Sequence, residues 1–151
     1  MFENKKGVTL VLLAITILVM CIIVGITVIT ADDLLRETDM RKMKTNLYLI
    51  KARAQTVFDD YLFDGTDELG SITNIDITKY GWSKDSTKYI YRQWNIKKLK
   101  EQGIDISNVA ANESFIIQYD FVNEEIDVAS TRGVVDSEGI ARYTLSSLEE
   151  K

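Results

Sequence analysis

Three carboxylates near the middle of the chain are the first candidates for chemistry. Asp64, Asp67 and Glu68 lie in the stretch DGTDEL, which has the acidic composition of a calcium-binding loop. A complete calcium site supplies about six to eight oxygen ligands at set spacing, and this stretch lacks them. We therefore interpret it as a solvated turn and predict no metal site.

The composition removes most catalytic chemistry. The chain has 151 residues, no histidine and a single cysteine, Cys21. The absence of histidine removes the commonest general base, the usual nucleophilic triads and most zinc sites. Residues 63–151 carry sixteen acids against ten bases. Because phosphate contacts need clustered Lys or Arg, nucleic acid is not expected as the main ligand. We predict that the protein is not an enzyme and uses no cofactor.

Aromatic residues gather between positions 80 and 94. They are Tyr80, Trp82, Tyr89, Tyr91 and Trp94. We interpret them as core packing, and the alternative is a contact surface for a ligand, a sugar or another subunit.

An apolar run near the N-terminus is the main element of the sequence. From Gly7 to Ala31 no residue is charged, and the run is mostly Val, Ile and Leu. A helix over residues 8–31 spans roughly 36 Å, enough to cross a hydrocarbon core of about 30 Å. Lys5 and Lys6 precede it, so the positive-inside rule places the N-terminus in the cytoplasm and the C-terminal domain outside the cell.

Three other interpretations of the run compete with a processed membrane helix. A cleavable secretory signal has a shorter apolar core and a small-x-small cleavage site, which Ile29-Thr30-Ala31 matches poorly. A core helix of a soluble protein would not stay uncharged on every side over this length. A plain signal anchor, which is never cut, is the main rival.

The residues around Gly7 resemble the N-terminus of type IV prepilins and pseudopilins. Lys5-Lys6-Gly7-Val8-Thr9-Leu10 matches a short basic leader ending in Gly, followed by an apolar residue, Thr, Leu and an apolar helix, as in clostridial Gram-positive variants. The resemblance implies that a membrane prepilin peptidase cuts the Gly7–Val8 bond and methylates the new amine of Val8. It also implies an assembly platform and other pilin subunits, identical or different, as partners.

One residue departs from the pattern of that family. Most major pilins place a glutamate five residues into the mature chain, where it is thought to neutralise the amine of a neighbouring subunit; here that position is Leu12. An amine buried without a partner would be costly. Leu12 therefore favours a minor or tip subunit, or a lineage that tolerates the loss. Gly25 is the one weak point of the assembly helix.

A second helical pattern continues the apolar run over residues 32–62. Its apolar residues follow a heptad spacing of alternating threes and fours. We expect them to form the seam on which the C-terminal domain packs: Met43, Leu47, Ile50, Ala54, Val57, Phe58 and Tyr61. Residues 34–46 are more polar and are a candidate contact between subunits. Asp64-Gly65 supplies a stop, so one unbroken helix is predicted from about residue 8 to 62.

The remaining residues predict a small antiparallel sheet. Extended structure is expected over 71–95, strands over 114–122 and 125–129 around a turn at Asn123-Glu124, and a last strand over 140–145. A short helix is predicted over 95–103, with Asn95 as N-cap and Gly103 as C-cap. The fold class is therefore α+β, with a long helix against a sheet of three to five strands.

The predicted organisation is a leader (1–7), a transmembrane and polymerisation helix (8–31), an amphipathic helix (32–62) and a globular head (63–151). It favours a structural subunit of a type IV pilus-like filament at the cell surface, serving adhesion, motility, DNA uptake or secretion. The alternative is an uncleaved bitopic membrane protein whose extracellular domain binds a ligand.

Overall fold

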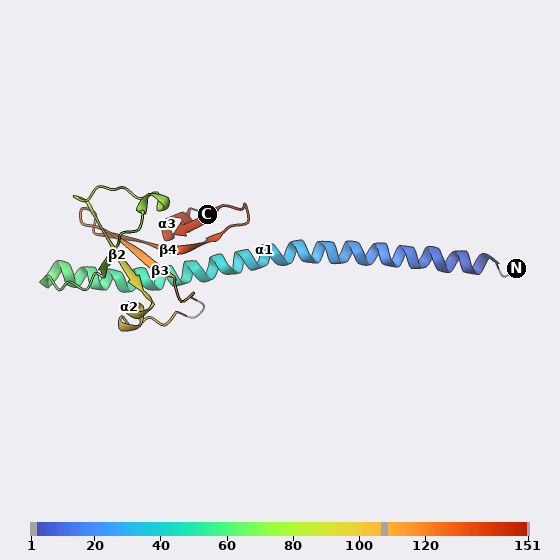
Figure 1. Ribbon diagram of the computed structural model, residues 1–151, viewed down its shortest axis with the longest axis horizontal. Helices are drawn as coiled ribbons and strands as arrows, with labels where there is room; N and C mark the ends of the chain where they lie inside the picture. The colour runs from blue at the N-terminus through green and yellow to red at the C-terminus, as the bar shows by residue number, and fades with distance from the viewer. Residues whose placement is uncertain (1–2, 107–108, 151) are drawn as a thin grey trace.

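One helix runs through the whole molecule and carries a sheet at its C-terminal end (Figure 1). The computed structural model describes residues 3–106 and 109–150, with side chains from residue 9 onward except those of residues 25–30. Helix α1 spans Glu3–Asp64, 62 residues, or roughly 93 Å. It starts earlier and ends two residues later than predicted. The expectation of one unbroken helix is confirmed.

The C-terminal end of α1 follows the expected stop. Gly65 has a φ of 78°, and its N–H donates to the carbonyl of Tyr61 at 3.0 Å. The left-handed conformation at this position is what glycine tolerates best. The carboxylate of Asp64 accepts the N–H of Thr66 at 2.9 Å. The chain therefore turns back from α1 toward the sheet.

The sheet is a five-stranded antiparallel meander in which every strand pairs with its neighbours in sequence. Its strands are β1 (Ser71–Ile72), β2 (Tyr89–Asn95), β3 (Ser114–Asp120), β4 (Glu125–Val135) and β5 (Ala141–Thr144). Two short helices, α2 (Ile96–Glu101) and α3 (Leu145–Glu149), and a 3-10 turn, η1 (Ile77–Tyr80), complete the head. The predicted α+β class and antiparallel sheet are confirmed.

Alternating side chains on the strands divide the head into two cores. On β3, Phe115, Ile117 and Tyr119 pack against α1, while Ile116 points to the opposite face. There it meets Tyr80 and Trp82, which lie in and after η1. The sheet is thus covered by the long helix on one side and by residues 73–88 on the other.

Several predicted boundaries were wrong. Most of residues 71–95 is not extended, because η1 and its turns interrupt the stretch between β1 and β2. Strand β4 continues to Val135, six residues past the expected end, across an irregularity in its pairing with β5 between Ala129 and Val134. The last strand ends at Thr144, whose side chain caps α3, so Leu145 is helical. Asn95 caps α2 as predicted, but its C-cap is Gln102, and Gly103 follows with a φ of 75°.

Candidate assembly site

Residues 9–24 in the N-terminal half of α1 expose their side chains on every side, and most of these are apolar. All its large hydrophobic residues between Leu10 and Val24 are exposed, Leu10 by 71% and Leu12 by 60%. The hydroxyl of Thr16 donates to the carbonyl of Leu13 at 2.8 Å and so needs no outside partner. An apolar surface of this extent is typical of a segment that packs against other proteins or lipid.

The predicted processing and membrane segments lie in the N-terminal part of α1. The first turns of α1 contain the predicted processing residues Lys5, Lys6, Gly7 and Val8, whose side chains lie outside the described part of the chain. Gly25 also lies in α1, in a stretch (25–30) for which only the backbone is described. Thr9 is described and exposed. Among the residues whose side chains are described, no helix is both long enough and apolar enough to cross a membrane.

The predicted seam on α1 lies against the sheet. Six of its seven residues are buried, namely Met43, Leu47, Ile50, Ala54, Val57 and Phe58. Tyr61 is half-buried at the edge, where its ring meets Phe121 at a centroid distance of 6.0 Å. Helix α3 adds a second attachment, since Lys44 Nζ donates to the carbonyl of Leu148 at 3.2 Å. Tyr48 donates its hydroxyl to Glu149, and that hydrogen bond raises the pKa of the phenol.

A groove of about 950 Å³ lies where α1 enters the head. Residues 36–46 of α1 form one wall, and the hairpin of β4 and β5 forms the other. The buried side chains of Met43 and Phe115 lie at its base. The groove falls in the stretch that the sequence singles out as a candidate subunit contact.

Basic side chains dominate the charge of the groove. Its lining includes four bases, Arg36, Arg41, Lys42 and Arg132, against two acids, Asp39 and Glu113. Arg41 pairs with Glu37 at 2.6 Å and Lys42 with Asp39 at 3.9 Å, and all four side chains are largely exposed. Exposed pairs of this kind contribute little and exchange readily, so the bases remain available to a partner.

The hairpin wall of the groove is held by a buried charge. Asp136 is fully buried and accepts the backbone N–H groups of Glu138 and Ile140, each at 2.9 Å. Arg142 donates its Nε–H to the same carboxylate at 3.1 Å. Gly133 has a φ of 69°, and a Cβ there would lie 2.5 Å from the Tyr143 ring. Contacts within the hairpin therefore hold this wall, and the Tyr143 ring also meets Tyr80 at a centroid distance of 5.9 Å.

The far end of α1 is acidic. No group of three potential metal ligands occurs among the described residues. Glu68 accepts from Gln102 Nε2 at 2.8 Å and lies 3.5 Å from Lys98 Nζ. These contacts lower the pKa of Glu68, and the hydrogen bonds from Thr66 lower that of Asp64. The acids beside the turn are thus ionised surface groups.

The five aromatic residues separate onto the two faces of the sheet. Trp94 is fully buried against α1, and its indole N–H donates to the carbonyl of Leu69 at 2.7 Å. Tyr80 and Trp82 are buried on the other face, where Trp82 stacks on Tyr91 at 5.7 Å between centroids. Tyr89 lies beside Tyr91, and both rings are half-buried. Most of the group therefore serves as core.

Two residues of the candidate contact surfaces, Arg132 and Phe63, were not predicted from the sequence. Arg132 reaches the groove from a part of β4 that was not predicted as strand. Phe63 is 92% exposed at the end of α1, whereas Phe58 one turn earlier is fully buried. The position of Phe63, directly before the Asp64-Gly65 stop and off the heptad seam, was the signal that could have identified it.

Comparison with known protein families, curated proteins and solved structures finds no match to the chain.

Proposed function

We propose that the protein is a structural subunit of a type IV pilus-like filament, minor or pseudopilin-like in role. In this proposal a prepilin peptidase cuts after Gly7, and the apolar half of α1 holds the chain in the membrane until assembly. The head is then extracellular, and the N-terminus before cleavage is cytoplasmic. The processed helix joins those of other subunits, with the assembly platform as a further partner.

The observation that carries the proposal is the division of α1 into two halves. The half that follows Lys5-Lys6-Gly7-Val8 exposes apolar side chains on all sides, while the second half is covered by a folded head. A soluble monomer gains nothing from such a helix, because its exposed apolar surface stays in contact with water. Helix–helix packing among copies covers that surface, through close shape fitting of Val, Ile and Leu.

Leu12 shapes the proposed role. In the apolar interior of a filament, the amine of Val8 would have no carboxylate at position 12 of a neighbour. An unpaired buried charge is costly, so a subunit of this kind suits the tip or a low copy number. Leu12→Glu should therefore raise the fraction of the protein found in filaments if the pairing is what limits its incorporation.

The experiment that tests the proposal is N-terminal sequencing and intact-mass measurement of the native protein, from membranes and from sheared surface material. We expect a chain that begins at a methylated Val8 and occurs in the sheared fraction. Gly7→Phe should leave uncut precursor, and Gly25→Ala is the control that should be processed normally. A native chain that keeps residues 1–7 and never leaves the membrane would refute the proposal and favour an uncleaved, membrane-anchored binding module.

A further inference from the structure

The two ends of the head carry opposite charge. The end of α1 and the turn after it, residues 59–68, hold five acids and no base: Asp59, Asp60, Asp64, Asp67 and Glu68. We call this stretch the acidic tip. At the other end of the head lies the groove, with its excess of bases. Both features include residues of α1. The groove lies where α1 enters the head, and the acidic tip lies at the C-terminal end of α1 (Figure 1).

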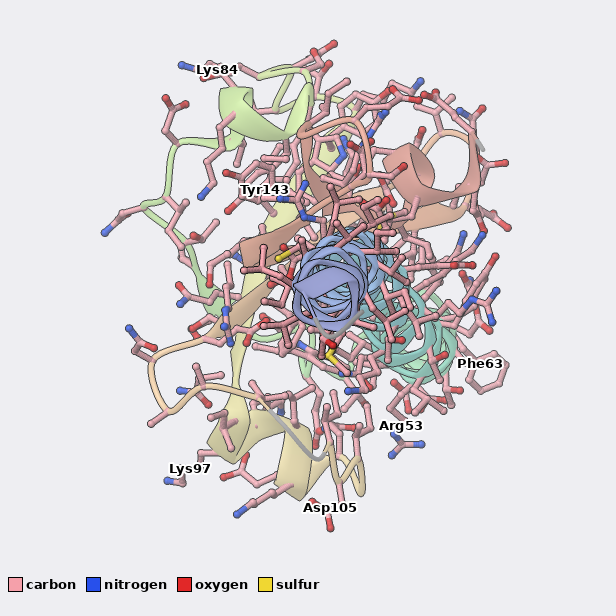
Figure 2. The ribbon with its side chains drawn as sticks, turned by 90° about the vertical axis from the view of Figure 1, so that its right-hand side faces the viewer. Arg53, Phe63, Lys84, Lys97, Asp105 and Tyr143 are labelled. Carbon is pink, nitrogen blue, oxygen red and sulfur yellow. The ribbon has the colours of Figure 1, made fainter. Side chains whose placement is uncertain are left out.

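The acidic tip also carries an apolar side chain with no cover. Phe63 is 92% exposed, and Figure 2 shows its ring projecting away from the helix at the edge of the molecule. Leu62 beside it is 45% exposed. Large aromatic side chains surrounded by charge are typical anchors of protein interfaces, because the ring supplies buried area and the rim supplies specificity.

The groove has the complementary construction. The buried, apolar side chains of Met43 and Phe115 form its floor, and the basic side chains lie on its two walls. A volume of about 950 Å³ is at the upper end of the roughly 300–1,000 Å³ typical of ligand pockets, so it can take an aromatic ring together with flanking residues. Opposite charges on the two surfaces would steer the approach and fix the orientation of the ring.

We propose that the acidic tip of one copy docks into the groove of the next copy, with Phe63 on the apolar base and the tip carboxylates facing Arg36, Arg41 and Arg132. This inference rests on the proposed function and adds to it the contact between successive heads. The two surfaces are different parts of the chain, so the contact is heterologous. Such a contact generates an open chain of subunits unless the rotation that relates successive copies closes a ring.

The geometry of α1 sets the spacing of this contact. The middle of the groove and Phe63 are about 22 residues apart on one helix, which corresponds to roughly 33 Å. Where two such helices run parallel, residues 12–34 of one copy lie beside residues 34–56 of the next. Three threonines of that second stretch donate their hydroxyls to carbonyls of their own helix, at 2.8, 2.9 and 3.3 Å: Thr38, Thr45 and Thr56. Thr38 and Thr45 also line the groove, so their hydroxyl donors are satisfied before the tip of another copy approaches.

The test is site-directed crosslinking of the full chain in the cells that make it. In a Cys21→Ser background, Thr66→Cys places a thiol at the tip and Thr45→Cys places one in the groove; both sites are exposed and uncharged. A short bis-maleimide applied to the double variant should give a ladder of dimers, trimers and higher species. Mixed single variants should give dimers only, and only between the two different variants.

Two further variants separate the docking contact from general crowding. Ser83→Cys, in place of Thr66→Cys, offers an exposed, uncharged site in the segment that covers the sheet face opposite α1, and it should give no ladder. Phe63→Ala in the crosslinking background should lower the yield roughly tenfold or more, which is the loss expected for an interface anchor. Because Phe63 is exposed, this substitution leaves the head folded.

The outcomes distinguish this contact from the proposed function. Processed protein in sheared filaments with no ladder, or a ladder indifferent to Phe63→Ala, overturns the docking contact and leaves the filament proposal intact. A ladder from chains that keep residues 1–7 supports the contact and refutes processing. If neither the ladder nor a chain beginning at Val8 is found, both are wrong.

Discussion

Phe58 and Phe63 are chemically identical and lie five residues apart on α1, but their substitution should have very different effects on stability. Phe58 is fully buried, and its ring meets Tyr119 at 5.2 Å and Phe121 at 5.0 Å between centroids. Burial of a Phe side chain contributes about 1.5–3 kcal/mol, and each aromatic pair adds about 0.5–1.5 kcal/mol. Phe58→Ala should therefore destabilise the head by about 4 kcal/mol, within the range for buried Phe→Ala changes.

The assay is urea unfolding of the full chain in detergent, followed by tryptophan fluorescence. Trp82 and Trp94 are both buried in the head, so the signal reports on the head rather than on the apolar half of α1. Phe63→Ala is the matched control and should change the free energy of unfolding by less than about 0.5 kcal/mol. Equal effects of the two substitutions, or a loss below about 1 kcal/mol for Phe58→Ala, would refute the assigned packing of the sheet on α1.

Three more predictions concern the head. Gly70→Ala should lower the free energy of unfolding by about 2–4 kcal/mol, because Gly70 has a φ of +117° and a methyl group there would lie 2.5 Å from the Trp94 ring. Thermal unfolding measures this loss, and an unchanged midpoint would contradict the geometry. Arg142→Ala should lower the free energy of unfolding by about 3 kcal/mol, because it removes the Arg142 cation from the buried carboxylate of Asp136. Denaturant unfolding measures this loss, and Arg142→Lys should restore part of it. Burial alone would raise the pKa of Asp120, but hydrogen bonds from Asn123 and the neighbouring backbone, with Lys88, hold it below the ordinary value. The stability this contributes is present above the unfolded pKa of about 3.9 and is lost as the pH falls through the folded pKa, so Asp120→Asn should weaken the acid dependence of unfolding below about pH 4.

The long helix, its packing face and the strands around the Asn123-Glu124 turn could be predicted because local patterns determine them. The alternating spacing of threes and fours from Met43 to Tyr61 identifies the face of α1 that the head covers. The composition of residues 114–122 predicts a strand. The structure adds that both faces of β3 are covered, since the adjacent residues Ile116 and Ile117 are both buried. Asp64-Gly65 marks the end of the helix because only a residue tolerant of positive φ closes it at low cost.

The segment between β1 and β2 could not be predicted, because its conformation depends on what it covers. Residues 71–95 were predicted to be extended, yet Ile75, Ile77, Tyr80 and Trp82 lie in turns and η1 over the second face of the sheet. Trp82 is fixed by a distant partner, since its indole N–H donates to Asp127 at 3.0 Å. Local propensity carries no information about such a contact.

Only one wall of the groove could be predicted from the sequence, because the other wall depends on contacts between residues that are distant in sequence. Residues 34–46 were predicted as a candidate subunit contact because they are more polar and carry fewer large apolar side chains than residues 47–62. The opposite wall depends on β4 continuing past Ala129, where its pairing with β5 is irregular. That continuation brings Arg132 close to Arg36 and Arg41, which lie far away in sequence. An irregular pairing of this kind has no reliable single-sequence signal.

The packing of the sheet along α1 has a mechanical consequence. The helix enters the head near Met40 and leaves it at Asp64, and its buried side chains follow one another along the axis. Tension applied between the N-terminal half and the head acts parallel to that row. Shear of this kind loads the apolar contacts together, whereas a force pulling the sheet away sideways would break them one after another. The head should therefore resist axial pulling far better than peeling.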